Sequence, residues 1–392
     1  MPWRESSPMS ERLRFIQACL DRTDHITEIC TRFGISEKTG HKWLARFRAD
    51  GPAGLSDRSH APQQPRCQLA PEVVARLVQL RKQHPKYGPT KLRDWLVQHE
   101  PATRWPAPSS IGALLARQGL VAPRRRREPT HARLVSGRTP ATGPNVVWTA
   151  DFKGEFRVTS GAWCYPLTVL DLYSHYLLRC TALPSTSVTP TWGAFERVFR
   201  EYGLPEVLRT DNGVPFAQPN SLGRLGALGF WWVRLGIRPE HIRPATPAEN
   251  GAHERFHKTL KAATTQPRAP SLRAQQQRFD RFQHEYNHER PHASLPQHRP
   301  PASVYTPGST RPYPRRLPPM LYPEGSELRY VTGPGAIRWR NAMIFLSSNL
   351  RGEYVRVTET TLDRFTVQYG PLALGELDPD TKRLTPNVRW VG

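Results

Sequence analysis

Three acidic residues, Asp151, Asp211 and Glu254, lie in segments that favour a metal-dependent catalytic site. Asp151 lies in the apolar, β-prone run 146–152, which predicts a buried strand. Asp211 ends a shorter run of the same kind, just before a glycine that interrupts the pattern. Glu254 lies in the segment 249–265, whose apolar residues recur at helical spacing. The sequence therefore predicts two carboxylates on strands and one on a helix.

Carboxylates in this arrangement suit Mg²⁺, which binds carboxylate oxygens and retains room for substrate phosphates. Two such ions about 4 Å apart can stabilise the attacking and the leaving oxygen of a phosphodiester displacement. Most of the 33 acidic residues of the chain are expected to be solvated surface groups. The three above are distinguished by the short sequence patterns that surround them.

Three patterns occur in order along the chain: W-T-x-D-F at 148–152, T-D-N-G-x-x-F at 210–216, and N-G-x-x-E-x-F-x-x-x-L-K at 250–261. Together with the segment 286–295, they resemble the integrase core of bacterial insertion-sequence transposases, relatives of the retroviral integrases. The resemblance covers residues from about 10 to 378. It implies a catalytic core with the α/β fold of RNase H.

The resemblance further implies a DDE transposase that binds the terminal inverted repeats of an insertion sequence and catalyses DNA cleavage and strand transfer. Asp151, Asp211 and Glu254 would be the catalytic residues and the ligands of Mg²⁺ or Mn²⁺, with two ions in each active site. The expected partners are double-stranded DNA, as element ends and as target, and further copies of the chain, because two ends must be paired before joining. No membrane partner is expected.

The third acid has an alternative in Glu249. Between Asp211 and Glu254 lie 42 residues, more than is usual in this superfamily, whereas Glu249 would leave 37. We prefer Glu254 because the pattern places the acid of the family there, and Glu249 suits the first turn of a helix. A fourth acid, Asp171, lies at a predicted turn, which favours a structural role.

The composition indicates a polyanionic partner. The net charge is +23 and the isoelectric point about 10.5. Residues 1–144 carry 25 Lys and Arg against 12 Asp and Glu, so the amino-terminal third is expected to be the main anchor for DNA.

The five cysteines form no C-x-x-C pair and no cluster with histidine, which argues against a zinc module and favours reduced thiols. No apolar run reaches transmembrane length and the amino terminus lacks an apolar signal core. We therefore expect a cytoplasmic protein, in the bacterial cytosol with the nucleoid.

Residues 10–60 predict a helix-turn-helix domain with three helices. Ser36 is the predicted N-cap of the third helix, and Trp43 is predicted to pack inward. The outward face of this helix carries candidate DNA-binding residues: Lys38, His41, Lys42 and Arg46.

Residues 66–122 predict a second helix-turn-helix domain, in which Ser109 and Ser110 would cap the third helix and contact DNA. A basic linker, 123–144, follows and opens with four candidate DNA-binding arginines: Arg124, Arg125, Arg126 and Arg127. Between two DNA-binding parts, this run is expected to follow phosphates or a minor groove.

The predicted catalytic core spans 145–298, with three strands followed by helix, strand, helix and strand. A Pro-rich linker, 299–323, leads to a small all-β barrel, 324–392, with six short strands between 327 and 376. Basic residues on the barrel suit DNA, but contacts between subunits fit the sequence equally well. The predicted fold class is thus multidomain: an all-α amino-terminal part, an α/β core and an all-β carboxy-terminal domain.

On the helix of Glu254, Lys258 and Lys261 are expected to bind the phosphates that flank the scissile bond. The opposite, buried stripe would be formed by Phe256, Leu260 and Ala263. Two other functions fit parts of the sequence: an RNase H-like nuclease without strand transfer, and a catalytically inactive DNA-binding regulator. The tandem helix-turn-helix domains argue against the first and the intact acidic triad against the second.

Overall fold

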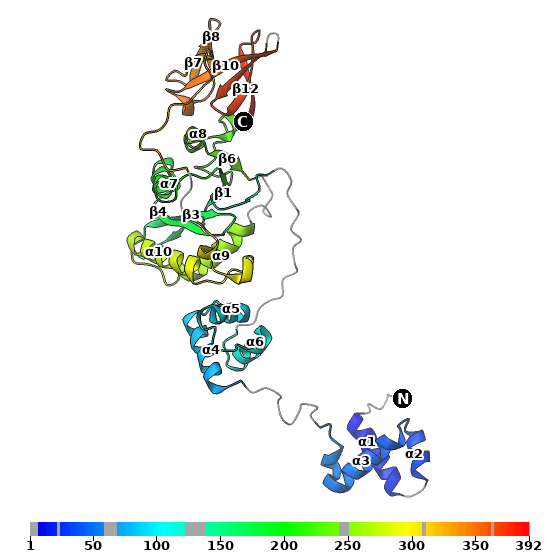
Figure 1. Ribbon diagram of the computed structural model, residues 1–392. Coiled ribbons are helices and arrows are strands. Elements are labelled where there is room, and N and C mark those ends of the chain that lie inside the picture. The colour runs from blue at the N-terminus through cyan, green and yellow to red at the C-terminus, as the bar shows by residue number, and fades with distance from the viewer. Residues whose placement is uncertain are drawn as a thin grey trace. The chain divides into compact units, whose positions relative to one another are not determined.

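The computed structural model describes residues 7–21, 24–58, 69–121, 138–242, 251–307, 311–361 and 364–391, without the side chains of 251, 252 and 254. The chain divides into two compact units, residues 1–70 and 71–392 (Figure 1). Among the described residues, no helix is both long and apolar enough to span a membrane.

The first unit is helical. Its elements are α1 (Pro8–Leu20), α2 (Ile26–Arg32), α3 (Glu37–Asp50) and a short 3-10 helix (Gly51–Leu55). They enclose a small core of buried side chains: Phe15, Ile16, Ile29, Cys30, Trp43, Leu44 and Leu55.

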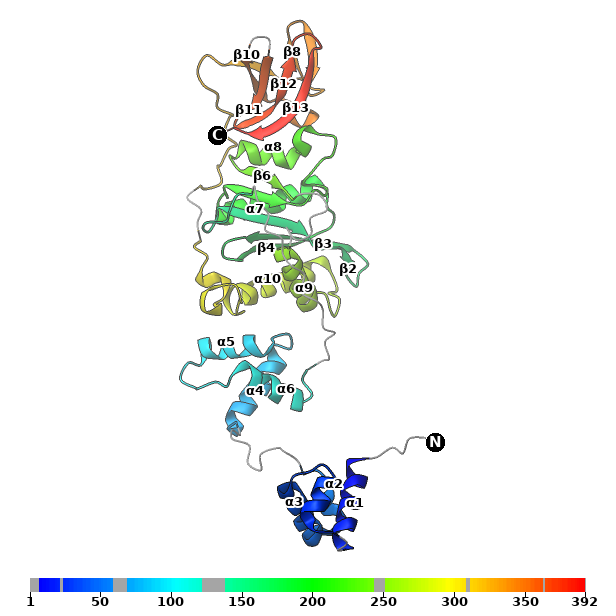
Figure 2. The ribbon, with the colours of Figure 1, turned by 90° about the vertical axis from the view of Figure 1, so that its right-hand side faces the viewer.

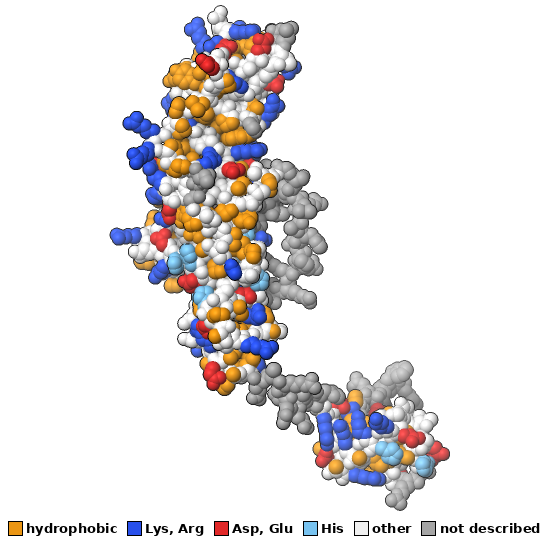
Figure 3. All heavy atoms as spheres, in the orientation of Figure 1, with side chains coloured by type: hydrophobic (Ala, Val, Ile, Leu, Met, Phe, Trp, Pro, Cys, Tyr) orange, Lys and Arg blue, Asp and Glu red, His pale blue; other side chains and the backbone are white. Residues whose placement is uncertain are grey.

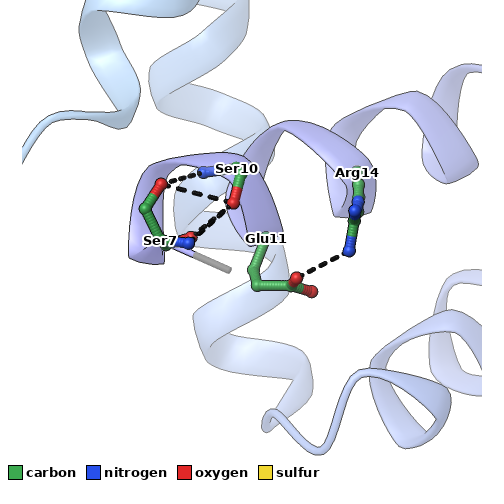
Figure 4. Close-up of polar contacts among 4 residues, drawn as sticks. All are labelled: Ser7, Ser10, Glu11 and Arg14. Atoms are coloured by element: carbon green, nitrogen blue, oxygen red, sulfur yellow. Dashed lines mark hydrogen bonds and ion pairs between the residues drawn. The ribbon is translucent and has the colours of Figure 1, made fainter. Parts of the chain in front are cut away.

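Capping side chains fix where these helices begin. Ser7 and Ser10 form a capping box at the start of α1, where each side chain accepts a hydrogen bond from the other residue's backbone N–H (Figure 4). Ser36 accepts from the Thr39 N–H at 3.3 Å, which confirms the predicted N-cap of α3. Between α2 and α3, Gly34 has a φ of +64°, a conformation that glycine adopts without strain.

The second helical segment contains α4 (Pro71–Gln83), α5 (Pro89–His99) and α6 (Pro108–Arg117). The N-cap of α6 is Ala107, and Pro108 takes the first helical position. The prediction that Ser109 and Ser110 cap this helix was therefore wrong, because a proline is pre-organised for the first turn and moves the start of the helix two or three residues earlier.

A mixed sheet forms the centre of the second unit. Its strands are β1 (Val147–Phe152), β2 (Phe156–Arg157), β3 (Trp163–Asp171), β4 (Leu177–Leu183), β5 (Val207–Thr210) and β6 (Arg238–His241). The order is β2-β3-β1-β5-β6, and β4 pairs with β3. Strand β1 pairs antiparallel with β3 and parallel with β5, which pairs parallel with β6. This arrangement confirms the predicted RNase H-like order of elements.

Helices cover both faces of the sheet (Figures 1 and 2). One face packs on α7 (Val188–Tyr202) and α8 (Ala227–Arg234) through a core that includes Trp148, Phe195 and Trp232. The other packs on α9 (Gly251–Thr264) and α10 (Leu272–His288) through a core that includes Phe256 and Phe279. Strand β1 is consequently buried on both sides.

The carboxy-terminal region is all β. It contains β7 (Glu327–Tyr330), β8 (Ala336–Trp339), β9 (Ala342–Phe345), β10 (Tyr354–Thr361), β11 (Arg364–Tyr369), β12 (Leu372–Asp378) and β13 (Arg383–Trp390). Five strands form the antiparallel sheet β13-β12-β11-β10-β7, and β8 pairs with β9. The first six strands match the predicted ones, whereas β13 was not predicted.

The core of this β region is shared with α8. Phe230 and Val233 of that helix lie in the same buried cluster as Val355, Val367 and Leu374. Other residues of α8, on its opposite side, belong to the core beneath the sheet. One helix therefore contributes to two hydrophobic cores.

Candidate active site

One predicted carboxylate, Asp151, lies on β1, and the other, Asp211, directly follows the neighbouring parallel strand β5. Ala150 of β1 is paired with Thr210 of β5, and Asp151 and Asp211 are the next residues along each strand. Adjacent strands lie about 4.8 Å apart, so this register brings the two backbone positions together at the carboxyl end of β5. Asp151 and Asp211 are 60 positions apart in the sequence, and the strand pairing brings them to the same end of the sheet.

The turn after β5 orients Asp211. Its Oδ1 accepts a hydrogen bond of 3.1 Å from the Gly213 N–H. A Cβ atom at Gly213 would lie only 3.0 Å from the other carboxylate oxygen, which explains the glycine in the pattern T-D-N-G. The Asn212 side chain donates to the carbonyl of Ile242, beyond β6, and Phe216 is buried against the rings of Phe152 and Trp232. These contacts anchor both sides of the turn.

The candidate third ligand, Glu254, belongs to α9 by its backbone, but its side chain is outside the described residues, as is all of the alternative Glu249. The buried residues of α9 are His253, Phe256, His257, Leu260 and Thr264. Ala263, predicted to be buried, is exposed. The buried face of α9 follows residues 253, 257, 260 and 264, because the orientation of the helix turns Thr264, and not Ala263, toward the sheet.

Two histidines that the sequence analysis missed join α9 to the strands. His253 Nδ1 lies 3.1 Å from the Thr149 hydroxyl of β1. His257 Nε2 lies 2.9 Å from the Thr168 hydroxyl of β3, which in turn donates to the Asp151 carbonyl at 3.0 Å. The only sequence signal was their spacing of four residues, which places both on one side of a helix.

His257 also faces the first carboxylate. Its Nδ1 lies 3.9 Å from Asp151 Oδ2, and the two side chains are only 10% and 13% exposed. Burial, with the nearby charge of Lys153, lowers the pKa of His257 to about 4, so the ring is neutral at neutral pH. Burial also raises the pKa of Asp211, although the Gly213 hydrogen bond opposes that shift. A buried carboxylate of this kind is stabilised in its ionised form by a bound cation.

Next to Asp211, β6 contributes His241, another residue that the sequence analysis missed. It is paired with Thr210 in the strand register, and its Nδ1 lies 3.2 Å from the Thr210 hydroxyl. Burial lowers the pKa of His241, although its contacts with Asp211 oppose the shift. The ring thus lies beside the second carboxylate.

The structure supports a structural role for Asp171, as predicted. This residue is fully buried at the end of β3. It accepts hydrogen bonds from the Asn145 N–H at 2.7 Å, the Ser174 N–H at 2.8 Å and the Ser174 hydroxyl at 2.6 Å. One carboxylate oxygen therefore closes the turn to β4, and the other holds the segment that precedes β1.

The predicted DNA-contacting residues fall into separate regions. Lys258 and Lys261 are exposed on α9. Ser109 and Ser110 are exposed in the first turn of α6. In the first unit, Lys and Arg side chains lie close together on the surface visible in Figure 3.

On α3 of that unit, Lys38, His41 and Lys42 are exposed and Arg46 is partly exposed. Lys42 Nζ lies 4.5 Å from the centre of the Trp43 ring, so the buried tryptophan stabilises the ammonium group by a cation–π interaction. The arginine run 124–127 lies outside the described residues.

The donor set fits a hard divalent cation. Asp151 and Asp211 provide carboxylate oxygens at one sheet edge, and the neutral His257 adds a nitrogen beside the first. The described side chains contain no group of three or more His, Cys, Asp and Glu residues arranged to hold a metal. A complete site would therefore require a further ligand.

Family comparisons agree with this arrangement. Residues 141–247 and 235–301 each match an integrase core domain family. Residues 11–63 match a helix-turn-helix domain family, and 39–115 a homeodomain-like domain family.

Among curated proteins, the chain is 28% identical over 129 residues to the Pol polyprotein of feline endogenous virus ECE1, and equally to the Gag-Pol polyprotein of baboon endogenous virus (strain M7). Each match covers 33% of this chain but only 12% and 7% of the polyproteins. A solved structure of the HTLV-2 integrase catalytic core domain in complex with magnesium is 15% identical, with a TM-score of 0.33, over 42% of this chain and 99% of that one. By these matches, the chain carries helix-turn-helix domains ahead of an integrase core domain.

Proposed function

We propose that this protein is a DDE transposase, which binds the terminal inverted repeats of its element and catalyses DNA cleavage and strand transfer. The observation that carries the proposal is the register of β1 and β5, which brings Asp151 and Asp211 to the same end of the sheet, with His257 of α9 facing Asp151. An integrase core with two neighbouring carboxylates supports phosphoryl transfer. The helix-turn-helix domains support binding to a specific DNA sequence.

In this proposal, Asp151, Asp211 and Glu254 hold Mg²⁺ or Mn²⁺, with two ions in each site. The bound ions would supply charge stabilisation at the scissile phosphodiester and lower the pKa of the attacking group.

Other residues of the chain would orient the carboxylates and bind the DNA. The Gly213 N–H holds the Asp211 carboxylate in one orientation, and the hydrophobic packing of Phe216 keeps the turn fixed during the reaction. Lys258 and Lys261, exposed on α9, would bind phosphates beside the scissile bond. The cations of α3 would recognise the repeat, and the run Arg124–Arg127 would follow the DNA backbone between the domains.

We propose a dimer or a higher multimer on paired ends, because strand transfer of an element joins both of its ends to one target. The boundaries of the parts are proposed as 10–60, 66–122, 145–298 and 324–392, with linkers between them. Whether the last part contacts DNA or another subunit is decided by crosslinking it within the assembled complex.

A joining assay distinguishes the candidate functions. Linear DNA that carries the repeats flanking the gene is incubated with the full-length protein, Mg²⁺ and a circular target. A transposase yields joined products that disappear with a chelator. An RNase H-like nuclease cuts without joining, and an inactive regulator binds the repeats without cutting, and either result would overturn the proposal.

A further inference from the structure

The hydrogen bonds of Thr168 determine which nitrogen of His257 carries the proton. Thr168 has a single hydroxyl proton, and it is donated to the Asp151 carbonyl at 3.0 Å, since a carbonyl can only accept. Toward His257 Nε2, at 2.9 Å, the Thr168 oxygen must therefore accept. The Nε2 atom consequently carries the proton of the neutral ring, and Nδ1 carries the lone pair.

That lone pair belongs to the nitrogen that faces Asp151. The Nδ1 atom lies 3.9 Å from Asp151 Oδ2, and both side chains are largely buried. Metal bonds from nitrogen or oxygen to small divalent ions are about 2.1 Å long, so two of them span up to about 4.2 Å. The observed 3.9 Å lies within this span, and a small rotation of either side chain would bring both atoms to the separation of neighbouring ligands on one ion.

We propose that His257 Nδ1 is an additional metal ligand, which binds the same divalent ion as Asp151 Oδ2 and gives the site a preference for Mn²⁺ over Mg²⁺. This inference rests on the proposed function, because it extends the carboxylate site by a nitrogen. Imidazole raises the affinity for transition metals, whereas Mg²⁺ strongly prefers oxygen.

The surroundings of His257 have the form expected of a ligating histidine. Such a residue usually donates its second ring N–H to a fixed acceptor, which sets the tautomer and the ring orientation. Here the Thr168 hydroxyl is that acceptor, and the same hydroxyl holds the Asp151 backbone.

The neighbouring His253 provides a matched control. It lies on the same side of α9, is buried, and contacts a threonine hydroxyl of the sheet at 3.1 Å. Within the described part of the chain, however, its Nε2 has no hydrogen-bond partner, and no carboxylate lies within ion-pair distance of its ring. A difference between the two histidines therefore separates metal binding from packing of the helix.

The test is pulsed electron paramagnetic resonance of Mn²⁺ bound to the full-length protein, together with titrations of Mn²⁺ and Mg²⁺. We expect nitrogen modulation of the Mn²⁺ signal in the wild type and in His253→Gln, and its loss in His257→Gln, whose amide can still donate to Thr168. The ratio of the Mg²⁺ to the Mn²⁺ dissociation constant should fall in His257→Gln. Thr168→Val, which removes the acceptor, should weaken Mn²⁺ binding by about 10- to 100-fold.

A measurement on the wild type keeps the test independent of folding of the variants. Labelling all histidines with ¹⁵N should change the frequency of the modulation, which proves that the ligand is an imidazole. The absence of nitrogen modulation, or its persistence in His257→Gln, with Mn²⁺ binding still abolished in Asp151→Asn, would overturn the inference and leave the proposed function standing. Unchanged Mn²⁺ binding in Asp151→Asn would instead overturn the metal site itself.

Discussion

The Thr168 hydroxyl oxygen lies 2.9 Å from His257 Nε2, so α9 is attached to the sheet directly beside Asp151. This attachment fixes the rotation of the helix that carries Glu254. A carboxylate on α9 can reach the metal site only if this rotation is maintained. The rotation of α9 therefore bears on whether Glu254 or Glu249 is the third ligand.

We expect Glu254→Gln to abolish cleavage and joining while end binding is retained, because the change removes charge from the metal site and no DNA contact. Glu249→Gln serves as the comparison and should retain most of the joining activity. Gel-based joining assays at equal occupancy of the repeat measure both. The opposite result, an active Glu254→Gln and an inactive Glu249→Gln, would assign the third ligand to Glu249.

Recognition of the element ends is expected to depend on α3. Lys42→Ala or Arg46→Ala should weaken binding of the repeat by about tenfold, since each loses a charged contact with DNA. If the contact is to a phosphate, the slope of log K against log salt should fall by about one unit. Arg14→Ala, which removes a cation on α1 that is paired with Glu11 (Figure 4), should leave both quantities unchanged. Equal effects of all three changes would argue against α3 as the helix that recognises the repeat.

The exposed lysines of α9 should act on the reaction and hardly on folding. Lys258→Ala and Lys261→Ala are expected to reduce strand transfer by about tenfold, with a defect that shrinks as salt rises, because salt screens the attraction between lysine and phosphate. The melting temperature should barely change, since exposed ion pairs contribute only about 0–1 kcal/mol. Arg281→Ala, an exposed cation on α10, is the control. A large fall in melting temperature with normal joining would show that the lysines are structural.

A buried ion pair near the site should contribute strongly to stability. Arg209 and Glu240 lie 3.0 Å apart on β5 and β6, with side chains 10% and 14% exposed. Glu240→Gln leaves a buried, unpaired guanidinium, and should reduce the free energy of unfolding by about 3 kcal/mol. The control Glu196→Gln breaks an exposed pair with Arg200 and should cost under about 0.5 kcal/mol. Similar costs for the two variants, measured by urea denaturation, would contradict this account.

The same pair predicts a pH dependence. Burial alone would raise the pKa of Glu240, but hydrogen bonds from Thr139 and Arg209 and the charge of Arg209 lower it overall. A carboxyl group with a lowered pKa in the folded state contributes stability above its ordinary value of 4.5, and this contribution is lost as pH falls through the folded value. The difference in stability between wild type and Glu240→Gln should therefore shrink below about pH 4.5. A difference that stays constant down to pH 3 would exclude an electrostatic origin.

The sequence was most informative where a local pattern decides the structure. Asp151 could be assigned to a strand and Asp211 to the end of one, because buried parallel strands consist of apolar, β-branched runs. Ser36 could be assigned as an N-cap from its position before a helical pattern. By contrast, β13 was missed because Arg383–Trp390 contains Pro386 and exposed polar residues, which are typical of an edge strand.

The rest depends on tertiary contacts. His253 and His257 have no pattern that distinguishes them from surface histidines, and only the threonines of β1 and β3 give them partners. The burial of Thr264 in place of Ala263 follows from how α9 lies on the sheet. The sharing of α8 between two cores likewise could not be read from its apolar composition alone.

The central claim is that Asp151 and Asp211 form one metal site for strand transfer, and it is tested most directly by Asp151→Asn and Asp211→Asn in the full-length protein. Repeat binding and joining are measured in the same samples with Mg²⁺ and with Mn²⁺. We predict unchanged binding and a loss of joining of more than about 100-fold in each variant, since even changes outside the ligand shell reduce activity by 10- to 100-fold. Joining near the wild-type level in either variant, or loss of end binding in a folded variant, would contradict the account.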